Sequence, residues 1–131
     1  MSGDPLEARA HAARERAHAP YSGYRVGAAL ETGDGRIFEG CNVENASYSV
    51  TCCAERVALY TAVAAGVRDF RRLVVSASGR TPYPCGACRQ ALSEFAADGL
   101  AITVVGDGGE RHEFTLGELL PKPFRMETGR S

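Results

Sequence analysis

The order of apolar and polar positions along the chain predicts short helices alternating with short strands. Some segments repeat apolar residues at helical spacing, whereas others are short apolar runs bounded by glycine or proline. The expected helices are residues 6–18, 54–65, 86–97 and a last turn at 116–120. The expected strands are residues 26–30, 36–41, 72–77, 101–105 and 111–114. Helices interleaved with strands in this order favour a mixed sheet with helices on both faces.

Turn-forming residues separate the expected elements. Pro20 follows the first helix, and a proline cannot continue a helix interior. Gly33-Asp34-Gly35 is typical of a hairpin turn between two strands. Gly66 is placed to end the second helix in a left-handed conformation. Residues 42–52 show no clear period, so we expect a loop there.

Length and composition indicate one globular domain over residues 1–131. The formal net charge of -1 gives no basic surface of the kind that long nucleic acids require. No apolar run approaches the ~20 residues of a membrane span. Residues 1–19 alternate alanine with charged residues and lack a signal-peptide core. We therefore expect a cytoplasmic protein that binds neither membranes nor long nucleic acids.

Three of the five cysteines lie in two short motifs, C-A-E-R at residues 53–56 and P-C-G-A-C-R-Q at residues 84–90. An odd number of cysteines in a cytoplasmic chain favours metal binding or free thiols over disulfides. Cys53, Cys85 and Cys88 offer three thiolates to one zinc ion and leave the fourth position open. Structural zinc sites usually have four protein ligands, whereas catalytic sites keep a place for water. The motifs therefore favour a catalytic zinc.

Both motifs lie where a helix is expected to begin. Cys53 precedes the second helix, and Cys85 with Cys88 begins the third. The partial positive charge of a helix N-terminus lowers the pKa of a thiol there. Cys85 and Cys88 are three residues apart, so they share one face of the first turn. Glu55, two residues after the first ligand, is placed to move the protons of the zinc water.

Three thiolates and a hydroxide carry more negative charge than one Zn²⁺ neutralises, which weakens the ion as a Lewis acid. Within the motifs, Arg56 directly follows Glu55 and Arg89 directly follows Cys88. Hydrogen bonds from groups around zinc ligands tune such sites. We therefore expect these arginines to hydrogen-bond the ligand sulfurs.

Three simpler interpretations of the motifs stay open. A structural zinc site could take Cys41 or Cys52 as its fourth ligand. Cys85 and Cys88 could form a redox pair, although this would not explain C-A-E. Glu55 could be a charge that the helix dipole favours. The combination of C-A-E with P-C-x-x-C matches the described signature of zinc deaminases in a three-cysteine variant.

Residues 17–124 resemble the cytidine deaminase family in its small, all-cysteine form. Besides the two cysteine motifs, three segments carry the resemblance: A-P-Y-S-G-Y-R-V-G-A-A-L at 19–30, G-C-N-V-E-N-A-S-Y at 40–48 and E-L-L-P at 118–121. The N-V-E-N segment separates nucleoside deaminases from other members of the superfamily. The resemblance implies a three-layer α/β/α sandwich with a five-stranded mixed sheet. It also implies a homotetramer with composite active sites.

The resemblance assigns roles around the metal. Cys53, Cys85 and Cys88 match the ligands of one Zn²⁺ per subunit. Glu55 matches the proton shuttle, and Arg56 matches the arginine that hydrogen-bonds ligand sulfurs. His11, His18 and His112 lie outside every motif, so none is expected to bind zinc.

The resemblance also assigns residues to the substrate. Asn42 and Glu44 match the pair that hydrogen-bonds the ribose, although a loop-capping Asn42 and a solvated Glu44 are the simpler alternatives. Tyr24 stands where the family usually has a phenylalanine that packs on the pyrimidine; without the resemblance it would be a core residue. Ala54 is also expected at the substrate.

Two more substrate-binding residues are expected to act between subunits. Tyr48 matches a residue at the subunit junction. Phe124 matches an aromatic residue that reaches a neighbouring subunit's pocket.

The implied reaction is hydrolytic deamination of cytidine and deoxycytidine to uridine and deoxyuridine, with release of ammonia, as in pyrimidine salvage. Zinc would activate a water that attacks C4. Glu55 would take its proton, pass it to N3 and then protonate the leaving amine, acting as both base and acid. Alternatives are a deaminase of a nucleoside antibiotic such as blasticidin S, a polynucleotide-editing deaminase and a structural zinc module.

Overall fold

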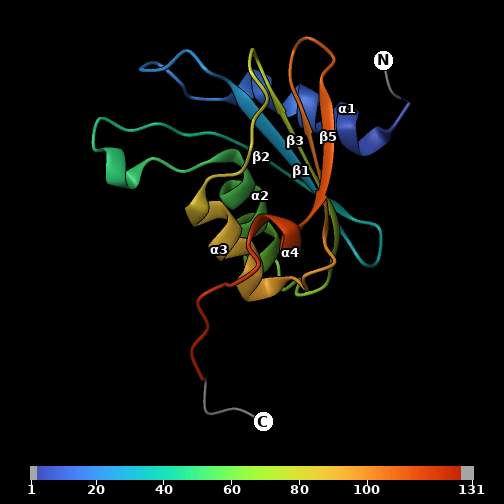
Figure 1. The fold of residues 1–131 in the computed structure, drawn as a ribbon. Helices are drawn as coiled ribbons and strands as arrows, with labels where there is room; N and C mark the ends of the chain where they lie inside the picture. The colour runs from blue at the N-terminus through green and yellow to red at the C-terminus, as the bar shows by residue number, and fades with distance from the viewer. Residues whose placement is uncertain (1–2, 128–131) are drawn as a thin grey trace.

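A five-stranded mixed sheet lies at the centre of the computed structural model, which describes residues 3–127 (Figure 1). The strands are β1 (Val26–Thr32), β2 (Ile37–Cys41), β3 (Phe70–Ala77), β4 (Ala101–Val105) and β5 (Arg111–Thr115). Their order in the sheet is β2-β1-β3-β4-β5. β3 and β4 run parallel, and the other neighbouring pairs run antiparallel. The expectation of a five-stranded mixed sheet is thus confirmed.

Helices cover both faces of this sheet. They are α1 (Pro5–Ala13), α2 (Ala54–Ala64), α3 (Gly86–Phe95) and α4 (Leu116–Leu119). α1 packs on one face, and α2 and α3 pack on the other (Figure 1). The three-layer α/β/α sandwich is therefore confirmed. In the described part of the chain, no helix combines the length and apolar character needed to cross a bilayer.

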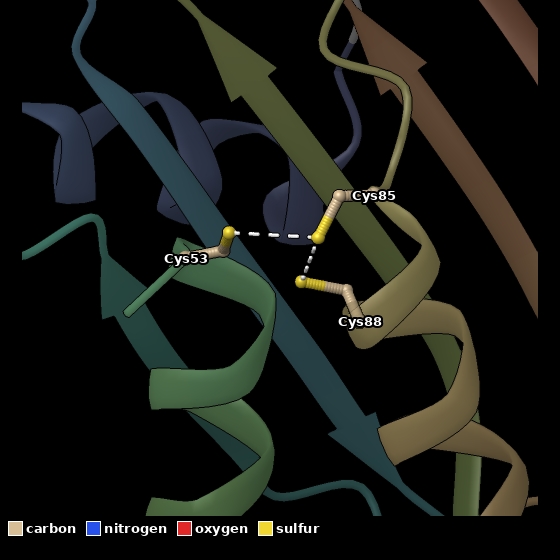
Figure 2. Close-up of side chains that lie close together, drawn as sticks. All are labelled: Cys53, Cys85 and Cys88. Carbon is tan, nitrogen blue, oxygen red and sulfur yellow. Dashed lines mark hydrogen bonds between the residues drawn. The ribbon is translucent and has the colours of Figure 1, made fainter. Parts of the chain in front are cut away.

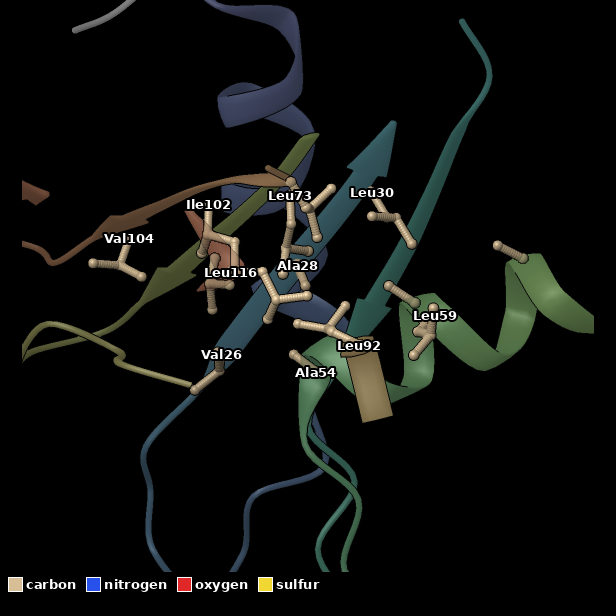
Figure 3. Close-up of a cluster of buried hydrophobic side chains, with 14 of the residues drawn as sticks. Val26, Ala28, Leu30, Ala54, Leu59, Leu73, Leu92, Ile102, Val104 and Leu116 are labelled. Carbon is tan, nitrogen blue, oxygen red and sulfur yellow. The ribbon is translucent and has the colours of Figure 1, made fainter. Parts of the chain in front are cut away.

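Alternating side chains of β1 join the two helical layers to the sheet. Ala28 and Leu30 belong to the larger apolar cluster with Leu59 of α2 and Leu92 of α3 (Figure 3). Ala29 points the other way, into the smaller cluster with α1. Successive strand residues face opposite sides of a sheet. A strand covered on both faces is therefore apolar without interruption, as residues 26–30 are.

Gly40 lets α2 approach the sheet closely. A Cβ atom at this position would collide with the Ala54 carbonyl oxygen and the Ala58 nitrogen, both of the α2 backbone. A larger residue would therefore push the start of α2 away from β2. Since Cys53 and Glu55 lie at that start, this contact sets the position of two expected site residues.

The first helix ends earlier than its composition predicts. α1 stops at Ala13 and continues only as a 3₁₀ turn at Arg14–Arg16, not to residue 18. His18 instead donates its N–H to the Asn42 carbonyl oxygen at 3.0 Å and pairs with Val43. This non-local pairing requires extended backbone, so tertiary structure overrides the helical propensity of the segment.

Candidate active site

Two helix N-termini bring three thiols together. Cys53 is the N-cap of α2, Cys85 is the N-cap of α3, and Cys88 lies on the first turn of α3 (Figure 2). The Cys53 and Cys85 sulfurs are 3.8 Å apart, and those of Cys85 and Cys88 are 3.4 Å apart. The chain thus places the three expected zinc ligands in one cluster.

The sulfur spacing fits a zinc ion. A tetrahedral zinc with bonds of about 2.3 Å holds its sulfurs about 3.8 Å apart. Within residues 3–127, the three cysteines form the one group of potential ligand atoms near enough to share a metal, with all sulfurs within 4.8 Å of one another. The group includes neither a histidine nor Cys41 or Cys52. The geometry therefore fits three protein ligands with a fourth position left for water.

Hydrogen bonds link the three sulfurs to one another and to Arg56. The Arg56 guanidinium donates to the Cys53 sulfur at 3.5 Å. Donation from the Cys88 thiol, together with Arg56, lowers the pKa of Cys53 to about 5. The pKa of Cys88 is raised, because it donates to Cys53 and is buried. The cluster therefore favours a thiolate at Cys53, and metal binding would release the remaining thiol protons.

Glu55 lies buried beside this cluster, with 5% of its surface exposed. Burial disfavours the ionised carboxylate and raises its pKa to about 7, with a smaller contribution from Cys53. A group that titrates near the working pH can both accept and return a proton. Glu55 therefore has the properties of a proton shuttle.

A cavity of about 740 Å³ opens beside the thiols and Glu55. Its volume lies in the range of small-molecule sites. It is lined by seven of the expected site residues: Tyr24, Asn42, Glu44, Cys53, Ala54, Glu55 and Cys85.

Asn42 and Glu44 are held in place by the chain itself. The Asn42 side chain accepts from the Val26 N–H at 2.9 Å and donates to the Tyr24 carbonyl at 2.8 Å. Glu44 accepts from the Ser22 hydroxyl and from two backbone N–H groups, at 3.0 and 3.2 Å. The Ser22 hydroxyl is the main cause of the lowered Glu44 pKa. Asn42 thus does cap the loop, and Glu44 is a fixed carboxylate rather than a freely solvated one.

Arg89 does not bond the sulfurs, so this part of the expectation is wrong. Its guanidinium donates to the carbonyls of Pro84 and Leu119, both at 2.8 Å. These bonds tie α4 to the loop that carries Cys85. Arg89 therefore supports the site through the backbone.

Tyr48 and Phe124 are exposed side chains that do not belong to the lining of this cavity. Their exposed fractions are 81% and 68%. The Phe124 backbone bonds the Gln90 side chain at 2.8 and 3.1 Å, and its ring stays exposed. Neither side chain lines the cavity within this chain.

The loop before Cys85 supplies four cavity residues that the sequence did not predict. Arg80, Thr81, Pro82 and Tyr83 all line the cavity, as does Glu110 from the β4–β5 turn. Residues 80–83 directly precede the P-C-x-x-C motif, and this position could have identified them from the sequence as neighbours of the site.

Thiols at two helix N-termini, a buried carboxyl group and an adjoining cavity on an α/β/α sandwich define a zinc deaminase. The chain belongs to the cytidine deaminase family. Residues 5–104 match the family model described as the cytidine and deoxycytidylate deaminase zinc-binding region.

Similar proteins and structures cover nearly the whole chain. A cytidine deaminase of Sporosarcina psychrophila is 45% identical over 97% of this chain and 94% of its own. The crystal structure of cytidine deaminase from Burkholderia pseudomallei has a TM-score of 0.89 at 46% identity, covering 95% of this chain and 100% of the other. Blasticidin-S deaminase of Bacillus cereus is 34% identical over 77% of both chains.

Proposed function

We propose that this protein is a zinc-dependent deaminase that hydrolyses cytidine and deoxycytidine to uridine and deoxyuridine and releases ammonia. The observation that carries the proposal is the cluster of three thiols beside buried Glu55 on one cavity. Similarity to cytidine deaminases over almost the whole chain supports a nucleoside substrate. Ammonia release from cytidine by the zinc-loaded protein tests it.

Cys53, Cys85 and Cys88 are the residues that would hold the zinc. Bound zinc supplies a Lewis acid that lowers the pKa of water toward ~7. Glu55 accepts the proton of the attacking water and delivers it to N3 of cytosine, which makes C4 more electrophilic. Glu55 then takes the remaining proton of that water, now on the hydroxyl oxygen at C4, and delivers it to the departing amine, so that the C4 carbonyl forms as ammonia leaves. One buried carboxyl group with a pKa of about 7 serves both transfers.

Asn42 and Glu44 are proposed to hold the ribose. The two bonds of the Asn42 amide leave one N–H and further acceptor capacity on its oxygen. The Glu44 carboxylate is fixed by Ser22 and can accept from a hydroxyl. A neutral sugar needs such paired donors and acceptors. Tyr24 and Ala54 are proposed to line the site beside these groups.

Arg56 is proposed to offset the charge of the three thiolates. Arg56→Ala removes the bond to the Cys53 sulfur. We expect zinc affinity or turnover to fall about 10- to 100-fold, as for other partners of metal ligands. Zinc content after dialysis against a chelator and kcat/KM for cytidine measure the effect. Arg71→Ala, an exposed arginine on β3, is the control. If Arg56→Ala keeps the zinc content and the kcat/KM of the wild type, a group other than Arg56 offsets the charge of the thiolates.

A homotetramer with composite active sites is proposed for the assembly. Large apolar side chains are exposed on the 42–52 loop, namely Val43, Tyr48 and Val50, and near the C-terminal end of the described residues, Phe124 and Met126. Such exposed groups favour a subunit interface. Sedimentation is expected to give about four times the chain mass of 13.9 kDa. A monomer with full cytidine turnover would contradict the composite site.

The similar proteins do not favour the alternative substrate, blasticidin S. The likeness to a blasticidin-S deaminase is lower in identity and coverage than that to the cytidine deaminases. Side-by-side kinetics with cytidine and blasticidin S distinguish the two.

A cytoplasmic location and a single catalytic domain over residues 1–131 stay predictions from the sequence.

A further inference from the structure

The loop between β3 and α3 forms one wall of the cavity and leads to Cys85. Its first residues are fixed by hydrogen bonds. The Ser78 N–H donates to the Arg25 carbonyl at 2.9 Å, and the Gly79 N–H donates to the Asp107 carboxylate at 3.1 Å. Its last residues are held by the bond from Arg89 to the Pro84 carbonyl. The stretch between these anchors, residues 80–83, is the part that lines the cavity.

Tyr24 contacts this stretch in two ways. Its hydroxyl donates to the Arg80 carbonyl at 2.9 Å. The Arg80 guanidinium carbon lies 5.0 Å from the centre of the Tyr24 ring, within the range of a cation–π contact. Within the described residues, the Arg80 carbonyl accepts no other hydrogen bond. Tyr24 and Arg80 are 56 positions apart in the sequence, so the contact joins two separate walls of the cavity.

We propose that Tyr24 is a positioning residue that latches the β3–α3 loop to the segment before β1 and so fixes the cavity wall. This role depends on the hydroxyl group, which a phenylalanine at this position lacks. It is distinct from packing on the base, which either aromatic ring can perform. The effect on catalysis rests on the proposed function, whereas the effect on the loop does not.

Tyr24→Phe removes the hydroxyl that donates to the Arg80 carbonyl and keeps the aromatic ring. In the zinc-loaded full chain, we expect the Tyr83 amide, which donates to the Thr81 carbonyl at 3.2 Å, to exchange with solvent about 2- to 12-fold faster, as loss of one net hydrogen bond predicts. KM for cytidine is expected to rise by a similar factor with kcat nearly unchanged, because a loosened wall binds substrate and transition state equally less well. NMR-detected amide exchange and steady-state kinetics measure the two effects.

Tyr60→Phe is the matched control, since Tyr60 lies on α2, is 48% exposed and forms no hydrogen bond through its hydroxyl within residues 3–127. Arg80→Ala keeps the carbonyl that accepts the bond and removes only the guanidinium. It is expected to speed exchange less than Tyr24→Phe does.

Faster exchange confined to residues 80–83 supports the latch. Exchange equal to that of Tyr60→Phe overturns it, even if KM rises, because the hydroxyl would then act on the substrate directly. A wild-type protein that does not deaminate cytidine would overturn the proposed function and leave the exchange result valid. The two failures are therefore distinguishable.

Discussion

Replacing Glu55 with glutamine is expected to lower kcat by about 10²- to 10⁴-fold while the zinc is retained. Glutamine preserves the size of the side chain but cannot accept and return a proton. Glu55 is buried and not among the clustered metal ligands, so its loss removes proton transfer and leaves the thiol cluster intact. Ammonia release from cytidine and zinc content, measured on the same purified sample, check the expectation.

Glu94→Gln is the matched control for this experiment. Glu94 is an exposed carboxylate on α3 and lies outside the cavity lining. The same chemical change there is expected to leave turnover and zinc content unchanged. Wild-type turnover in Glu55→Gln with zinc in place would rule out Glu55 as the proton shuttle.

Replacing Cys88 with serine is expected to release the zinc and abolish turnover. Cys88 is fully buried, and its sulfur lies 3.4 Å from that of Cys85. A serine hydroxyl fills nearly the same space but does not ionise into a soft zinc ligand. The loss of affinity should exceed the 10- to 100-fold that removal of an outer partner costs. Zinc titration with a competing chelator measures it.

Cys41→Ser separates this effect from a general loss of thiols. Cys41 lies at the end of β2, is partly buried and does not belong to the sulfur cluster. This variant is expected to keep zinc and activity. A Cys88→Ser protein that retains tight zinc and normal turnover would show that the metal is bound elsewhere.

The sequence predicted the elements of the fold well, because most of them depend on local pattern. The strand at residues 101–105 has the expected bounds, and the two helices that follow Cys53 and Cys85 begin where predicted. The first helix was predicted too long because its end depends on pairing between His18 and Val43. No local pattern contains that pairing, since the partner lies on a distant loop.

In the site, too, features that follow from a local pattern were predictable, whereas contacts between distant residues were not. Spacing and helix geometry place Cys85 and Cys88 together, whereas Cys53, 32 positions before Cys85, is joined to them by the match to the deaminase signature. The contact of Arg89 with the Leu119 carbonyl could not be predicted, because no local pattern links residues 30 positions apart. The bond between Tyr24 and Arg80 spans 56 positions and was missed for the same reason. The walls of the cavity come from segments that lie far apart in the sequence, such as residues 22–26, 51–55 and 80–85.

The most direct test of a zinc-dependent deaminase at this site is ammonia release from cytidine by the purified wild-type chain, with zinc measured in parallel. We expect about one zinc per chain, equal amounts of ammonia and uridine, and turnover that is lost with a chelator and restored by zinc. A zinc-loaded protein that releases no ammonia from cytidine or deoxycytidine would contradict the account and favour a structural zinc module.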